Sequence, residues 1–137
     1  MNNTNDYSFY NLRTPTILTN SYVASTTILG TAPNTPAISC ENQLILYVHF
    51  TKGSLTSAEL IIEFSHDGTT NFVQETTDDL TASTGITTQR LSTRTFTSSG
   101  DYRIPIRIND AHIRVSVKGT GTTTGSLMSV DAIIGNN

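Results

Sequence analysis

The sequence predicts an all-β protein, an antiparallel β-sandwich of about eight strands of the jelly-roll or immunoglobulin-like kind. Apolar and polar residues alternate in several short segments, which is typical of strands with one buried face. Turn residues separate these segments at close spacing, as they do in sandwiches and small barrels. No window of helical length repeats apolar residues every three to four positions.

The composition fits a single domain whose strands meet water on one side. The chain has 137 residues, of which 36% are hydrophobic and 14% are charged. Both fractions are low for a soluble domain, and Thr, Ser and Asn make up the difference. Threonine is both β-branched and polar, so it suits strand faces exposed to solvent.

We expect residues 1–20 to form an extended N-terminal arm and residues 21–137 to form the sandwich domain. The arm is polar and carries Tyr7, Phe9 and Tyr10 in an irregular pattern. Two outcomes are open for it: the arm lies along its own sandwich, or it docks on a neighbouring subunit. The segment lacks a basic stretch followed by an apolar one, so we expect no secretion signal. No apolar run is long enough to span a bilayer.

Residues 21–29 are expected to form the first strand, and the loop 31–39 follows because it contains two prolines. Residues 44–50 are partly apolar on both faces, which indicates a central or covered strand. Residues 58–65 place Leu60, Ile62 and Phe64 on one face. The Asp-Gly pair after this strand accepts positive φ and predicts a tight turn, from which residues 72–76 pair back.

The second half begins with an expected polar loop at 77–85 and a Thr-rich strand or strand pair at 86–97. Residues 102–108 and 112–119 alternate strictly on either side of a short turn, which predicts two antiparallel strands with one buried face. Pro105 lies inside the first of these, so that strand should be at an edge or a bulge. A turn rich in Gly and Thr then leads to a last strand at 126–134.

The charge pattern and the reactive side chains favour no enzyme, metal or cofactor. A net charge of −3 and a pI near 5.4 argue against nucleic-acid binding through phosphate neutralisation. Cys40 is alone, so no internal disulfide is expected. The three histidines, His49, His66 and His112, lack metal-ligand spacing, and the acidic residues near position 78 lack the spacing of a calcium loop.

Three segments together resemble small β-sandwich structural proteins of tailed-bacteriophage virions, including capsid decoration (auxiliary head) proteins. They are LILYVHFTKG at 44–53, ELIIEFSHDGTTNFVQ at 59–74 and IRVSVKGTGTTTGS at 113–126. The resemblance covers roughly residues 44–135 and implies a non-enzymatic protein that cements the capsid through contacts between subunits. It implies a location on the capsid surface of a virion assembled in the host cytoplasm. The partners would be the major capsid protein or other virion proteins and further copies of the chain, without nucleic acid or membrane.

The residues expected to make assembly contacts come from the arm and from outward strand positions. They are Tyr7, Phe9, Tyr10, Arg107, Arg114 and Lys118. For the three basic residues, the alternative is an ordinary solvated position on a strand.

Two other functions remain open. One is a tail, neck or baseplate accessory protein with the same sandwich. The other is a carbohydrate-binding module for host attachment, because the Ser65–Gly68 turn followed by Phe72 also resembles discoidin-like carbohydrate-binding sandwiches. Those proteins usually place tryptophan near this aromatic position, and the chain has none, which leaves Tyr47 and Tyr102 to stack on a sugar.

Overall fold

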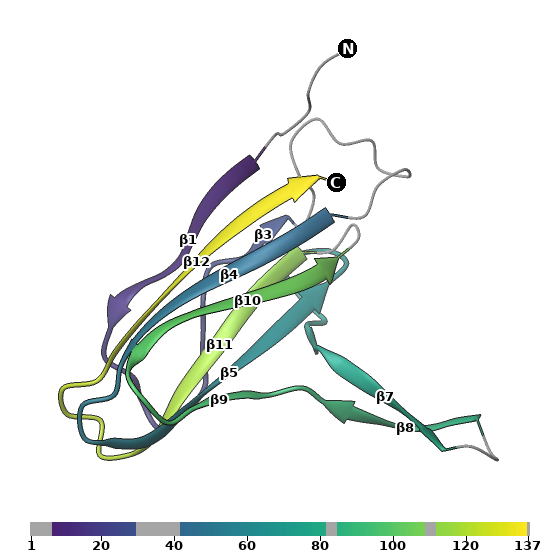
Figure 1. The fold of residues 1–137 in the computed structure, drawn as a ribbon. Helices are drawn as coiled ribbons and strands as arrows, with labels where there is room; N and C mark the ends of the chain where they lie inside the picture. The colour runs from purple at the N-terminus through teal and green to yellow at the C-terminus, as the bar shows by residue number, and fades with distance from the viewer. Residues whose placement is uncertain (1–6, 30–41, 82–84, 109–111, 137) are drawn as a thin grey trace.

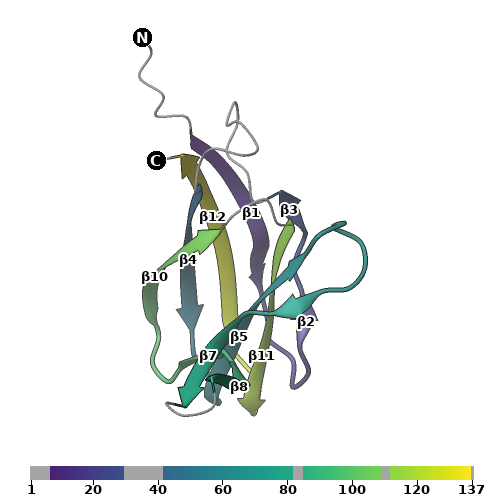
Figure 2. The ribbon, with the colours of Figure 1, turned by 90° about the vertical axis from the view of Figure 1, so that its right-hand side faces the viewer.

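The computed structural model describes residues 7–29, 42–81, 85–108 and 112–136, and in it two antiparallel sheets pack face to face (Figures 1 and 2). The four-stranded sheet contains, in spatial order, β1 (Tyr7–Thr16), β12 (Leu127–Asn136), β4 (Asn42–Thr51) and β10 (Gly100–Ile108). The six-stranded sheet contains β2 (Val23–Ala24), β11 (His112–Gly121), β5 (Leu55–Ser65) and β6 (Val73–Gln74), with β3 (Ile28–Leu29) on β11 and β9 (Arg94–Phe96) on β5. The predicted β-sandwich is confirmed.

The core lies between the inward faces of the two sheets. Alternate residues of β4, β5, β11 and β12 are buried there, as the period of two requires. The largest fully buried side chains are Phe50, Leu18, Leu44, Leu46, Leu60, Ile62, Ile113, Met128 and Ile134. Most of the predicted inward residues belong to this core, while Phe64 and Ile104 are partly buried against it.

The N-terminal segment lies along its own sandwich, which was the first of the two outcomes left open. Residues 7–16 form β1, which pairs antiparallel with β12 at the edge of the four-stranded sheet. Leu12 and Leu18 are both buried in the core. Residues 7–18 are therefore part of the sandwich and not a free arm, because Leu12 and Leu18 contribute to its core.

The two strands predicted on either side of Asn109 are both present, but they lie in different sheets. β10 pairs with β4, and β11 pairs with β5. The glycine-rich segment after β11 likewise leads to β12 in the opposite sheet. Alternation indicates which face of a strand is buried, but it does not indicate the partner strand. The prediction for Pro105 is confirmed, because β10 is an edge strand and pairs on one side only.

The polar loop predicted at 77–85 is wrong in part. β7 (Thr76–Thr81) and β8 (Gly85–Leu91) pair as a two-stranded ribbon that extends away from the sandwich (Figure 1). The ribbon sequence is polar and rich in threonine, so it lacks the alternation of a half-buried strand although threonine favours extended backbone. The loop predicted at 31–39, and Cys40, lie outside the described residues.

One end of the sandwich is closed by two turns in direct contact. The Ser54 N–H, after β4, donates a hydrogen bond of 2.9 Å to the carbonyl oxygen of Thr124, before β12. Gly53 has φ +57°, and a Cβ on it would lie 2.4 Å from the carbonyl carbon of Gly125. These glycines allow the connections of the two sheets to approach at backbone distance.

Candidate functional site

The outer face of the four-stranded sheet carries two adjacent cross-strand rows of side chains. The apolar row runs across all four strands and contains Phe9, Ile133, Ile45 and Pro105, which are in register with one another. The polar row is the next outward row and contains Asn11, Asp131, Tyr47 and Arg103. Directly opposed cross-strand residues have their Cβ atoms about 4.5–5.5 Å apart, so each row forms a continuous strip.

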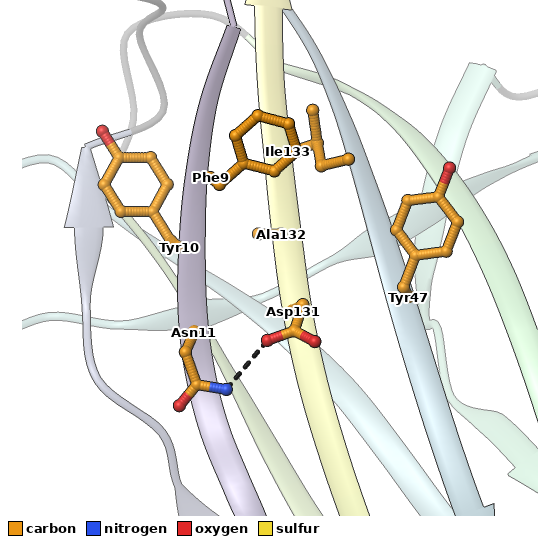
Figure 3. Close-up of a pocket in the computed structure, with 7 residues that line it drawn as sticks. All are labelled: Phe9, Tyr10, Asn11, Tyr47, Asp131, Ala132 and Ile133. Atoms are coloured by element: carbon orange, nitrogen blue, oxygen red, sulfur yellow. Dashed lines mark hydrogen bonds between the residues drawn. The ribbon is translucent and has the colours of Figure 1, made fainter.

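The two ends of the apolar row, Phe9 and Pro105, are open to solvent, and Ile133 and Ile45 between them are partly buried. Phe9 is 75% exposed, and Tyr47 in the polar row is 42% exposed. Between them the surface forms an open hollow of about 420 Å³ over Ala132 and Ile133 (Figure 3). Solvent-exposed aromatic residues at the end of an apolar strip and beside it are a feature of interaction surfaces.

The polar row provides hydrogen-bonding groups beside this hollow. The Asn11 Nδ2 group donates to Asp131 Oδ1 at 2.8 Å and to the Arg13 carbonyl oxygen at 3.3 Å (Figure 3). Both Asn11 and Asp131 are exposed, and so is Arg103 at the other edge of the row. The row thus presents acceptor oxygens at the β1 side of the sheet and a cation at the β10 side.

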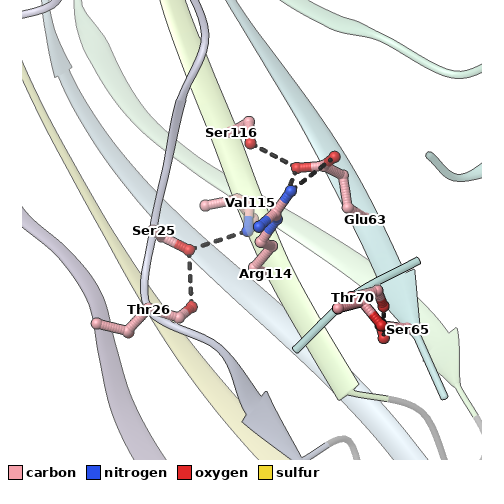
Figure 4. Close-up of polar contacts among 8 residues, drawn as sticks. All are labelled: Ser25, Thr26, Glu63, Ser65, Thr70, Arg114, Val115 and Ser116. Atoms are coloured by element: carbon pink, nitrogen blue, oxygen red, sulfur yellow. Dashed lines mark hydrogen bonds and ion pairs between the residues drawn. The ribbon is translucent and has the colours of Figure 1, made fainter. Parts of the chain in front are cut away.

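The outer face of the six-stranded sheet differs, because its charged groups contact one another. Arg114 Nε donates to Glu63 Oε1 at 3.0 Å, and its guanidinium carbon lies 3.7 Å from the centre of the Phe72 ring. The Ser116 hydroxyl donates to the same carboxylate at 2.5 Å (Figure 4). Glu63, Arg114 and Phe72 therefore contact one another over this part of the sheet.

Lys118 repeats this arrangement further along β11. Its Nζ lies 3.5 Å from Glu59 Oε2 and 4.9 Å from the centre of the Tyr22 ring. Burial raises the pKa of the Tyr22 hydroxyl, and the nearby Glu59 carboxylate raises it further. Two strand-to-strand ion pairs with aromatic covers thus occupy the outer face of this sheet.

The turn after β5 has a structural role. The Asp67 carboxylate accepts hydrogen bonds from the Thr69 and Thr70 N–H groups, both at 2.9 Å, and from the hydroxyls of Thr70 and Ser65. These donors hold the pKa of Asp67 well below its ordinary value. Gly68 has φ +78°, the positive φ predicted for the Asp-Gly pair, but the connection is longer than the predicted tight turn, because β5 ends at Ser65 and β6 begins only at Val73.

The structure separates the six expected assembly residues. Phe9 lies on the outer face, whereas Tyr10 points to the other side of β1 and packs against the core. The charges of Arg114 and Lys118 already have partners within the chain. Tyr7 and Arg107 lie in β1 and β10, and their side chains are outside the described part of the structure.

Sequence reasoning missed several members of the two rows, among them Asn11, Asp131 and Ile133. Alternation in β12 predicts that Asp131 points outward. It does not predict which residues of β1 and β4 lie beside Asp131, because the sequence does not reveal the register between strands that are far apart in the chain. Tyr47, one of the two tyrosines expected to stack on a sugar, is exposed here. The other, Tyr102, packs against Phe96 with ring centroids 4.6 Å apart.

The side chains that the structure describes contain no group of three or more His, Cys, Asp and Glu residues that could hold a metal ion. His49 pairs with Asp101 on the outer face of the four-stranded sheet, where both are exposed. Within the same described part, no helix is long and apolar enough to cross a membrane.

No protein-family model matches the chain, and no curated protein matches it in sequence.

Proposed function

We propose that this chain is a non-enzymatic structural protein of a tailed-bacteriophage virion that decorates or cements the capsid through contacts between subunits. The observation that carries the proposal is the apolar row Phe9–Ile133–Ile45–Pro105, which crosses all four strands of one sheet and is exposed at both ends. An exposed strip of this kind favours a protein that acts by binding another surface. The virion setting is supported by the segments at 44–53, 59–74 and 113–126.

In this proposal the outer face of the four-stranded sheet is the contact surface. The partners are the major capsid protein, other virion proteins or further copies of the chain, and the site of action is the capsid surface. Each contact is small, and repetition over a symmetric shell raises the overall affinity. A tail, neck or baseplate position would use the same contact surface.

The proposal is tested by mass spectrometry on particles purified by density gradient from cultures of the source of the gene. The chain is expected in the particle fraction, in repeated copies relative to the major shell protein. Particles should lose the chain when Phe9 is replaced by Ser, and should keep it when the exposed Thr122, in the turn before β12, is replaced by Arg. Particles that lack the wild-type chain would contradict the proposal.

A second candidate function is carbohydrate binding, and the hollow between Phe9 and Tyr47 favours it. Aromatic rings can stack on the apolar face of a sugar, while the Asp131 carboxylate beside them can accept hydrogen bonds from hydroxyl groups. A glycan array probed with the full chain tests this function. Binding that is lost in Tyr47→Ala would support it, and an array without signal would count against it.

A further inference from the structure

We propose that the outer face of the four-stranded sheet binds the same face of a second copy of this chain, related by a two-fold axis parallel to the strands. The axis would pass between the two central strands, β12 and β4. This inference rests on the proposed function, because it takes the outer face of the four-stranded sheet as the contact surface. It adds that the molecule bound there is a second copy of the chain. The two rows make the face complementary to itself.

The apolar row would meet itself across this axis. The rotation exchanges β1 with β10 and β12 with β4, and it keeps each row at the same height along the strands. Phe9 then lies opposite Pro105 of the second copy, and Ile133 lies opposite Ile45. An interface with two-fold symmetry uses the same patch on both subunits, so each of these contacts occurs twice.

The polar row would match donors with acceptors under the same rotation. Arg103 lies opposite Asn11 of the second copy, next to the Asp131 carboxylate that Asn11 contacts at 2.8 Å. Tyr47 lies opposite Asp131, and its hydroxyl can donate to the outer carboxylate oxygen. Neighbouring strands are about 4.8 Å apart, so an arginine side chain spans the offset between Arg103 and Asp131. Within the two rows, no like charges face each other.

Other arrangements fit less well. A two-fold axis perpendicular to the strands and midway between the two rows would set apolar side chains against polar ones. The same axis placed through the apolar row would put the polar rows of the two copies on opposite sides of the axis, so Arg103 would meet neither Asn11 nor Asp131 of the second copy. The outer face of the six-stranded sheet offers less, because Arg114 and Lys118 there already contact carboxylates and rings of the same chain.

The size of the face sets the expected strength of binding. Four strands span about 14 Å between the outermost strand axes, from three spacings of about 4.8 Å. Ten-residue strands such as β12 are about 33 Å long, so the face covers about 460 Å² per copy and about 900 Å² for two copies. This is below the lower end of specific interfaces, which bury roughly 1,200 Å² or more in total. We therefore expect weak, concentration-dependent association that becomes effective when many copies are held on one shell.

The test is sedimentation velocity on the full chain from about 1 µM to about 1 mM, the range in which weak interfaces are populated. The wild-type chain should shift with concentration towards twice its mass of 14.8 kDa. Asp131→Arg and Arg103→Asp should each raise the dissociation constant by about tenfold or more, because each places two like-charged pairs across the axis. Phe9→Ser should have a similar effect, and Thr122→Arg should have none.

Mixing the two charge variants gives the decisive result. In a heterodimer of Asp131→Arg with Arg103→Asp, both cross-axis pairs are again opposite in sign. The equimolar mixture should therefore associate more strongly than either variant alone. Circular dichroism on each variant confirms that the fold is retained.

The inference is overturned if the wild-type chain stays monomeric over the whole range, or if it associates but mixing restores nothing. Glycan binding by a monomeric wild-type chain would assign the face to a sugar. The proposed function fails separately. A monomeric chain found in purified particles would overturn only the two-fold contact, whereas a self-associating chain absent from particles would overturn only the virion assignment.

Discussion

Gly53 and Gly125 show how single residues position the connections between the two sheets. At Gly53 the backbone is left-handed, with φ +57°, and the nearest atoms are the backbone of the opposite turn. A side chain there has no flexible neighbour to displace. The strand ends that it joins, β4 and β5, belong to different sheets, so this contact helps to hold the two layers in register.

We expect Gly53→Ala to lower the free energy of unfolding by roughly 2–6 kcal/mol. Backbone strain for a residue with a Cβ contributes about 1–3 kcal/mol, and crowding against Gly125 contributes a similar amount. Gly100→Ala is the matched control, because a Cβ at Gly100 meets the Tyr102 ring at an ordinary 3.7 Å. Urea unfolding of both variants measures the difference, and equal losses would contradict this account of the turn.

Asp67 makes the stability of the turn after β5 depend on pH. Its pKa is lowered in the folded chain by hydrogen bonds, so the folded state favours the ionised form. This contribution is complete above the ordinary value of 3.8 and is lost as the pH falls through the lower folded pKa.

Calorimetry of the wild-type chain and of Asp67→Asn between about pH 5 and pH 1, the range over which such a carboxylate loses its contribution, tests this expectation. The wild-type Tm should fall more steeply with acid than the variant Tm, because the variant lacks the titrating carboxylate. Parallel curves would show that Asp67 does not contribute through its charge.

At the scale of elements, β1 has two faces with different roles. Leu12 is 2% exposed on the core side, and Phe9 is 75% exposed on the outer side. Removing residues 1–20 would therefore remove a core strand together with any contact residue, so point substitutions separate the two roles better than truncation does.

Leu12→Ala should destabilise the fold by about 2–5 kcal/mol, the usual loss for a buried leucine. Phe9→Ala should change stability by less than about 0.5 kcal/mol, as exposed positions usually do. Thermal unfolding at low protein concentration, where association is negligible, measures both. A large loss for Phe9→Ala would mean that this ring supports the fold.

The two sheets should respond differently to loss of an outward arginine. Arg114→Ala removes an ion pair with Glu63 and a stacking contact with Phe72, and we expect it to cost about 1–2 kcal/mol. Arg103→Ala on the opposite face should be nearly neutral for folding and should weaken self-association. Denaturant unfolding checks the first effect, and sedimentation velocity checks the second. The reverse pattern would contradict the assignment of the two faces.

The strands that sequence patterns predicted well are those with one buried face. Alternation located β4, β5, β10, β11 and β12, and the proline rule placed Pro105 at an edge. β7 was missed because its polar residues give no alternation, whereas β8 falls largely within the strand or strand pair predicted at 86–97. β1 was missed because its aromatic and apolar residues follow an irregular pattern, and its pairing with β12 contains register shifts. Periodicity reports burial, so strands without a buried face leave little signal.

At the scale of the whole molecule, the two outer faces of the sandwich differ in how far their groups are satisfied within the chain. On the outer face of the six-stranded sheet, Arg114 and Lys118 each contact a carboxylate and an aromatic ring of the same chain. On the outer face of the four-stranded sheet, an apolar row lies beside a row of hydrogen-bond donors and acceptors. This asymmetry could not be predicted from the sequence, because it depends on which strands are neighbours. Consecutive strands such as β10 and β11 lie in opposite sheets, so residues near one another in the chain end on opposite faces.

Cryo-electron microscopy of purified particles would show which face of the sandwich meets a neighbour. We expect protein density against the row from Phe9 to Pro105, with a second copy of the chain related by a two-fold axis along the strands. We also expect solvent over Arg114 and Lys118. A map in which the outer face of the four-stranded sheet meets only solvent, while the six-stranded sheet forms the contact, would contradict these expectations.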